Sequence, residues 1–126
     1  MEQRYLIDTN TVIDYLDNKL PINSSNLIDL IASQISVITR IELLGWSNAT
    51  SEQVKVLEQF VNTSVVHKLE EPIILKSIEI RKAYKTKLPD AIIAATAIAN
   101  NLTLITHNTN DFKNINELKL IDPFEA

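Results

Sequence analysis

The 126-residue chain is 45% hydrophobic and 22% charged, with 12 Lys and Arg against 16 Asp and Glu and a formal net charge of −4. This is the composition of a globular domain, and the absence of cysteine excludes disulfides, thiolate zinc sites and a cysteine nucleophile. The single glycine excludes a Walker loop and a dinucleotide-binding glycine fingerprint, because both need several glycines.

The N-terminal segment lacks the cationic-then-apolar layout of a signal peptide, so we expect a cytoplasmic protein. A strand is expected over residues 4–8, and a helix follows it with Val12, Ile13 and Leu16 on its inner face. Asp8 lies where the strand passes into the helix. Its carboxylate is either the cap of that helix or a member of a site.

The middle of the chain carries two helix-start patterns. A loop is expected over residues 21–25, between two early helices. Thr39 and Glu42 then have the spacing of a capping box, with Thr39 as the N-cap and Glu42 in the first turn. Thr50 and Gln53 repeat this pattern before the helical segment EQVKVLEQFV.

Two prolines mark the next helices. Pro72 and Pro89 each suit the first position of a helix, the interior position that tolerates proline. In the first of these helices Arg81 shares a face with Ile74. The second, DAIIAATAIA, is apolar nearly all round, so we expect it to be packed on both sides. Its apolar run is about half of a membrane span, so we expect no membrane partner.

Short strand candidates alternate with these helices along the whole chain. Such alternation predicts the α/β class, with one domain over residues 1–126 and a central, mainly parallel sheet of about five strands covered by helices on both faces. The strand candidates are residues 4–8, 35–38, 64–69, 102–106 and 118–122.

Four acidic residues share one kind of position, at the end of a predicted strand or near the start of a predicted helix: Asp8, Glu42, Asp90 and Asp111. In an open parallel sheet these positions meet at the edge where ligands bind. Each acid also has a structural explanation as a cap or a helix-dipole partner, and Asn108 with Asp111 fits another cap pair. Caps do not explain four acids on one edge. Carboxylates gathered there would repel one another without a cation, and oxygen ligands suit Mg²⁺ or Mn²⁺.

Four segments resemble, in order and spacing, the acidic motifs of the PIN-domain nucleases, and most of all the small toxin ribonucleases of the bacterial VapBC type. They are YLIDTNTVIDYL, TRIELLG, KLPDAIIAATAIANNLTLIT and THNTNDF, within a resemblance that spans residues 4–124. Asn10 and Thr106 match family positions that line the site, and Asn108 stands where some relatives carry an acid. The resemblance implies a catalytic and metal-binding set of Asp8, Glu42, Asp90 and Asp111.

The activity that the resemblance implies is a Mg²⁺- or Mn²⁺-dependent endoribonuclease. A cation held by these acids would lower the pKa of a bound water and orient it for attack on an RNA phosphodiester. The resemblance also implies a homodimer and a small VapB-type antitoxin that blocks the acidic groove. The net charge of −4 argues against an RNA partner, because phosphate binding usually leaves a basic footprint. Setting four acids aside as ligands leaves 12 basic against 12 acidic residues, which weakens this objection. The candidate RNA phosphate contacts are Arg40, Arg81, Lys85 and Lys87.

Three other interpretations compete with the toxin. A receiver domain phosphorylated on aspartate needs an Asp after the third strand and a Lys after the fifth, and neither SVVHKL nor LKLID supplies them. The loss of one of the four acids would favour a non-catalytic PIN-like binding module, but all four acids are present. A PIN nuclease acting in RNA maturation has the same motifs as a toxin, although a bare domain fits the toxin better.

Overall fold

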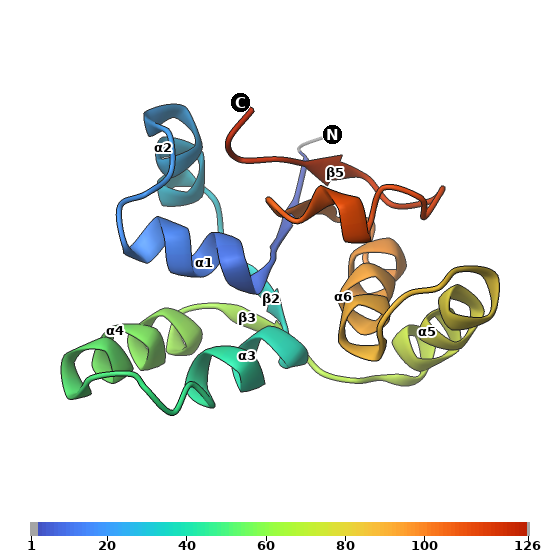
Figure 1. Cartoon of the computed structure of the whole chain (residues 1–126), viewed down its shortest axis with the longest axis horizontal. Coiled ribbons are helices and arrows are strands. Elements are labelled where there is room, and N and C mark those ends of the chain that lie inside the picture. The colour runs from blue at the N-terminus through green and yellow to red at the C-terminus, as the bar shows by residue number, and fades with distance from the viewer. Residues whose placement is uncertain (1–2, 126) are drawn as a thin grey trace.

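The computed structural model describes residues 3–125, in which short strands alternate with helices (Figure 1). The strands are β1 (Tyr5–Ile7), β2 (Gln34–Ser36), β3 (Val65–His67), β4 (Thr103–Ile105) and β5 (Leu120–Ile121). The helices are α1 (Thr9–Leu16), α2 (Ile22–Leu30), α3 (Val37–Leu44), α4 (Ser51–Asn62), α5 (Glu71–Ala83), α6 (Leu88–Ala99) and the short 3-10 helix η1 (Thr109–Asp111). The α/β class is confirmed. In this described part, no helix is both long and apolar enough to cross a membrane.

The strands form two parallel ladders that lie next to each other. One ladder has the order β1-β4-β5 and the other joins β2 to β3, with all of these pairs parallel. β1 and β2 lie side by side, so the spatial order is β3-β2-β1-β4-β5. The predicted five parallel strands are therefore present, with the hydrogen-bonded ladder interrupted between β2 and β1.

Helices cover both faces of this sheet. Leu6 and Leu104 belong to the core cluster around α6, whereas the next residues along their strands, Ile7 and Ile105, belong to the cluster under α1, α2 and α4. This alternation is the period-two pattern of a strand with two buried faces. In α6 every residue from 91 to 97 is buried, as its apolar sequence predicts, and the helix lies between the sheet and α5 (Figure 1).

The start of α3 differs from the prediction. The strand expected over residues 35–38 ends at Ser36, whose hydroxyl accepts a hydrogen bond of 3.1 Å from the backbone N–H of Ile38 and so caps the helix. Thr39 lies inside α3 and is fully buried. The predicted Thr39–Glu42 capping box is therefore wrong, and Glu42 is the sixth residue of α3 rather than part of its first turn.

Three smaller differences concern prolines. The loop expected over residues 21–25 is the start of α2, with Pro21 as its N-cap. Pro72 and Pro89 are each the second residue of their helix rather than the first. The second position tolerates proline for the same reason, because its N–H also lacks a partner within the helix. The capping box of α4 is confirmed, with its two reciprocal hydrogen bonds.

Candidate active site

The candidate site lies where the strand order changes direction. β1 has β2 on one side and β4 on the other, and the register places Ile7 opposite Ile105. Asp8 and Thr106 come directly after these two residues and are therefore neighbours at the carboxyl edge of the sheet. In open α/β sheets, ligands bind in the crevice outside this edge at such a switch point.

Asp8 is buried and each of its carboxylate oxygens is held. Oδ1 accepts a hydrogen bond of 2.9 Å from the backbone N–H of Thr9, and Asp8 is the N-cap of α1. Oδ2 accepts a hydrogen bond of 2.7 Å from the Thr106 hydroxyl and a longer one, of 3.5 Å, from the Asn10 amide. The cap interpretation of Asp8 is therefore confirmed through Oδ1, and the site interpretation, which concerns Oδ2, stays a prediction.

Thr9 connects the second acid to this edge. Its hydroxyl donates a hydrogen bond of 2.6 Å to Glu42 Oε1 and lies 3.0 Å from the hydroxyl of Thr39. α1 and α3 are thereby joined at the exposed side chain of Glu42. Thr9 was not among the predicted site residues. Its position directly after Asp8 was the available signal, but the contact with Glu42 spans 33 residues.

Asp90 lies in the first turn of α6 and is half-buried. Burial and the charges of Asp111, Asp8 and Glu42 together raise the pKa of Asp90 from 3.8 to about 6, against a lowering effect of Lys87. Burial likewise raises the pKa of Asp8, with smaller contributions from Glu42 and Asp111. The four predicted acids therefore interact electrostatically.

Asp111 ends η1, and its side chain is exposed. Its Oδ2 accepts a hydrogen bond of 2.6 Å from the Asn108 amide, and the N–H of Asn108 donates in turn to the Thr106 hydroxyl at 3.0 Å. The predicted cap pair is wrong, because the Asn108 side chain makes no capping bond to η1 and holds Asp111 instead.

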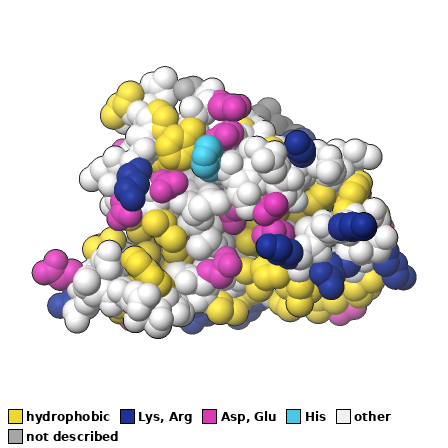
Figure 2. All heavy atoms as spheres, viewed as in Figure 1, with side chains coloured by type: hydrophobic (Ala, Val, Ile, Leu, Met, Phe, Trp, Pro, Cys, Tyr) yellow, Lys and Arg dark blue, Asp and Glu magenta, His cyan; other side chains and the backbone are white. Residues whose placement is uncertain are grey.

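A hollow of about 430 Å³ contains two of the acids, Asp90 and Asp111, together with Lys85 and Lys87. Acidic side chains gather across the middle of this face of the molecule, with Lys or Arg side chains beside them (Figure 2). The two predicted arginines are not among the residues lining the hollow. Arg40 is exposed on α3, and Arg81 donates a hydrogen bond of 2.8 Å to the carbonyl oxygen of Thr86.

The donor set suits a hard divalent cation, because it consists of carboxylate, amide and hydroxyl oxygens. The pKa values of Asp8 and Asp90 are raised chiefly by burial and further by the neighbouring carboxylates, and a bound cation would favour the charged forms of both. Within residues 3–125, however, no three Asp, Glu or His side chains are already arranged as metal ligands. The residues therefore fit a cation by their chemistry, while the coordination geometry is not preformed.

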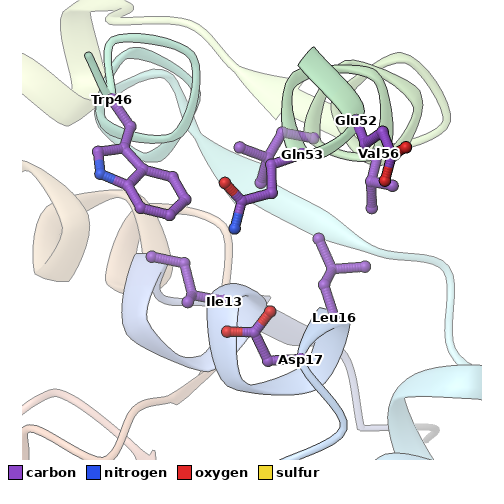
Figure 3. A pocket seen from close by; sticks show the side chains of 8 residues that line it. Ile13, Leu16, Asp17, Trp46, Glu52, Gln53 and Val56 are labelled. Carbon is purple, nitrogen blue, oxygen red and sulfur yellow. The ribbon is translucent and has the colours of Figure 1, made fainter. Parts of the chain in front are cut away.

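A second hollow, of about 230 Å³, lies away from the predicted site residues, between α1, α4 and the segment after α3 (Figure 3). Ile13 and Leu16 of α1 face Val56 of α4 across it, and Trp46 lies along one side. Most of the lining residues are apolar, and the polar ones are Asp17, Glu52 and Gln53. It offers an apolar surface and no part of the acid cluster.

Comparisons with known proteins agree on one family. The model of the PIN domain matches residues 5–118. Ribonuclease VapC1 of Methanocaldococcus jannaschii is 33% identical over 129 aligned positions, which cover 96% of this chain and 89% of that protein. A toxin–antitoxin complex from Klebsiella pneumoniae contains a chain with 32% identity and a TM-score of 0.76, covering 97% and 99% of the two chains. A DNA-bound VapBC structure from Salmonella typhimurium gives 25% identity and a TM-score of 0.84, with coverage of 96% and 98%.

Proposed function

Because the chain belongs to the PIN-domain family, we propose that it is an endoribonuclease and the toxin of a VapBC-type toxin–antitoxin pair. The observation that carries this proposal is the electrostatic coupling of four acids from four separate segments at the switch point of the sheet. A helix cap needs no such coupling. A site that holds a divalent cation against a phosphodiester does need several acids close together, because they are the ligands of the cation.

The proposed cofactor is Mg²⁺ or Mn²⁺, held by Asp8, Asp90 and Asp111. Bound there, it would supply a water of lowered pKa and offset the negative charge of the phosphodiester. The chain's own polar groups orient the ligands. Thr106 and Asn10 fix one oxygen of Asp8, and the Asn108 amide fixes Asp111.

Glu42 completes the proposed catalytic set. Its carboxylate is exposed and is held by the Thr9 hydroxyl, so it is available either to bind a second cation or to orient the attacking water as a general base. In both roles the position of Glu42 depends on Thr9, which follows Asp8 directly. The α1–α3 contact therefore sets the distance between the acids on the two helices.

The proposed partner is a small VapB-type antitoxin, because solved structures similar to this chain are VapBC and other toxin–antitoxin complexes. An antitoxin segment placed over the acids would exclude RNA from them. We further propose that the protein acts as a homodimer in the cytoplasm. In this proposal the antitoxin covers the hollow of about 430 Å³ that contains Asp90 and Asp111.

The test of this function is cleavage of single-stranded RNA in Mg²⁺ or Mn²⁺, with EDTA as the block. We expect 5′-phosphate and 3′-hydroxyl ends, since a water activated at these acids does not need the RNA 2′-hydroxyl. Asp8→Asn should abolish cleavage while leaving the circular dichroism spectrum unchanged. Near-normal turnover by Asp8→Asn would refute the assignment. Growth arrest on expression, relieved by a co-expressed antitoxin, separates a toxin from an RNA-maturation nuclease.

A further inference from the structure

The hollow next to Asp90 and Asp111 contains more than the acids. It lies between the segment joining α5 to α6 on one side and η1 with the residues that follow it on the other. Its volume of about 430 Å³ is within the range of ligand pockets, roughly 300–1,000 Å³. The acids lie at one side, where they are part of the candidate active site. The remaining polar lining residues include Lys85, Lys87, Asn110 and Asn114.

Neither of the two lysines in the hollow is held in an ion pair by the described residues. Lys87 is close enough to lower the pKa of Asp90, yet among the described residues neither Lys85 nor Lys87 forms an ion pair. Lys76, on α5, provides the contrast, because its ammonium lies 2.9 Å from Glu79 and 3.4 Å from Glu117. Exposed lysines without a carboxylate partner, beside a site for phosphodiester cleavage, are suited to contacting RNA phosphates.

The side-chain amides of the two asparagines in the hollow are also free to bind a ligand. The Asn108 amide donates to Asp111, whereas the amides of Asn110 and Asn114 make no hydrogen bond to any of residues 3–125. An asparagine amide presents a donor and an acceptor side by side. Unstacked RNA bases are recognised by such groups on their hydrogen-bonding edges.

An apolar wall gives this part of the hollow a fixed shape. Ile115 is almost completely buried in the core around α6, and Tyr84, half-buried, packs against the same core. The Tyr84 hydroxyl accepts a hydrogen bond of 3.4 Å from the backbone N–H of Asn116. The aromatic ring therefore has a defined position in the hollow that Asn110 and Asn114 also line.

We propose that this hollow binds one nucleotide adjoining the scissile phosphate, with Lys85 and Lys87 contacting phosphate and with Asn110 and Asn114 contacting the base. The two asparagines thereby select the RNA sequence that is cut. This inference rests on the proposed ribonuclease function and adds to it the subsite that recognises the substrate. The ligand is a single-stranded ribonucleotide whose base is turned out of its stack.

The first experiment measures cleavage preference in a pool of single-stranded RNAs randomised around the cut. Asn110→Ala, Asn114→Ala and the double variant are compared with Asn116→Ala, a neighbouring exposed residue outside the hollow. Loss of a base contact should reduce the preference at one position next to the cut by roughly ten-fold. Asn116→Ala should keep the wild-type preference. Unchanged preference in the double variant, or an equal change in Asn116→Ala, would overturn the proposal.

The second experiment measures binding without cleavage. Fluorescence anisotropy of a short labelled RNA is recorded with Asp8→Asn protein, alone and combined with Lys85→Ala, Lys87→Ala or the control Lys113→Ala. Each of the two lysine variants in the hollow should weaken binding and reduce the slope of log affinity against log salt by about one, and Lys113→Ala should do neither. RNA cleavage with no effect of these lysines would refute the subsite and leave the proposed function standing. Lysine-dependent binding without cleavage by wild type would refute the function and leave the subsite.

Discussion

The Thr106 hydroxyl donates a hydrogen bond of 2.7 Å to Asp8 Oδ2, and the two residues are 98 positions apart in the chain. Thr106 is fully buried and also accepts the N–H of Asn108. One hydroxyl therefore joins the carboxyl end of β1, the carboxyl end of β4 and the segment that carries Asp111. Without metal, this bond counteracts the rise in the pKa of Asp8 that burial causes.

Thr106→Val should impair the site while keeping the volume of the side chain. Removal of the donor raises the pKa of Asp8 further, so a higher pH is needed to ionise it. The acid limb of the profile of kcat/KM against pH should move to higher pH, and Thr106→Ser should restore its position. The check is a pH series of RNA cleavage with all three proteins. An identical acid limb in Thr106→Val would show that Asp8 does not control it.

Asp90 should make the metal-free protein less stable as the pH rises. Its pKa is about 6 in the folded state against 3.8 as the ordinary value, so the folded state binds more protons between these limits. The free energy of unfolding therefore decreases from about pH 4 to pH 6. A shift of this size corresponds to about 3 kcal/mol, which screening at a half-exposed side chain reduces to roughly 1–2 kcal/mol.

Asp90→Asn should remove this loss, so that in EDTA at pH 7 the variant unfolds at higher denaturant concentration than wild type. If Asp90 only stabilised the dipole of α6, the substitution would instead cost about 0.3–1 kcal/mol. Urea unfolding at several pH values distinguishes the two signs. Added Mn²⁺ should stabilise wild type more than Asp90→Asn, because a bound ligand shifts the folding equilibrium.

Thr9→Val should release Glu42 from its position. The hydroxyl that holds Glu42 Oε1 is lost, and a carboxylate displaced by about 1 Å is enough to cost a catalytic step roughly 100-fold. We expect kcat to fall with little change in KM, and Thr9→Ser to recover most of the activity. Equal activity of Thr9→Val and wild type would show that catalysis does not depend on the position in which Thr9 holds Glu42.

Asn108→Asp restores the acid that some relatives carry at this position of the last motif, THNTNDF. The amide now donates to Asp111 at 2.6 Å, and a carboxylate in its place would repel Asp111. Without metal we expect a loss of about 1 kcal/mol in the free energy of unfolding, since both side chains are exposed. Mn²⁺ should bind the variant more tightly, and isothermal titration calorimetry measures this. Unchanged affinity would place Asn108 outside the metal site.

The elements and the acids follow from local sequence patterns, because strand runs, capping residues and apolar periodicity act over a few positions. The contacts that orient the acids do not. Thr9 meets Glu42 only because α1 packs beside α3, and nothing within either segment predicts that contact. The start of α3 was predicted wrongly for a related reason. Ser36 and Thr39 are both good N-caps by residue type, and burial of Thr39 in the folded chain decides between them.

The pairing of β1 with β4 also sets the time at which the chain can become active during synthesis. Residues 5–7 find their partners at residues 103–105, and Asp111 follows still later. Contacts between such distant segments form slowly compared with local ones. A nascent chain of which only the first three helices have emerged contains Asp8 and Glu42 but neither Asp90 nor Asp111, so the proposed site is not yet assembled. We therefore expect the chain to cleave no RNA until nearly the whole domain has emerged from the ribosome.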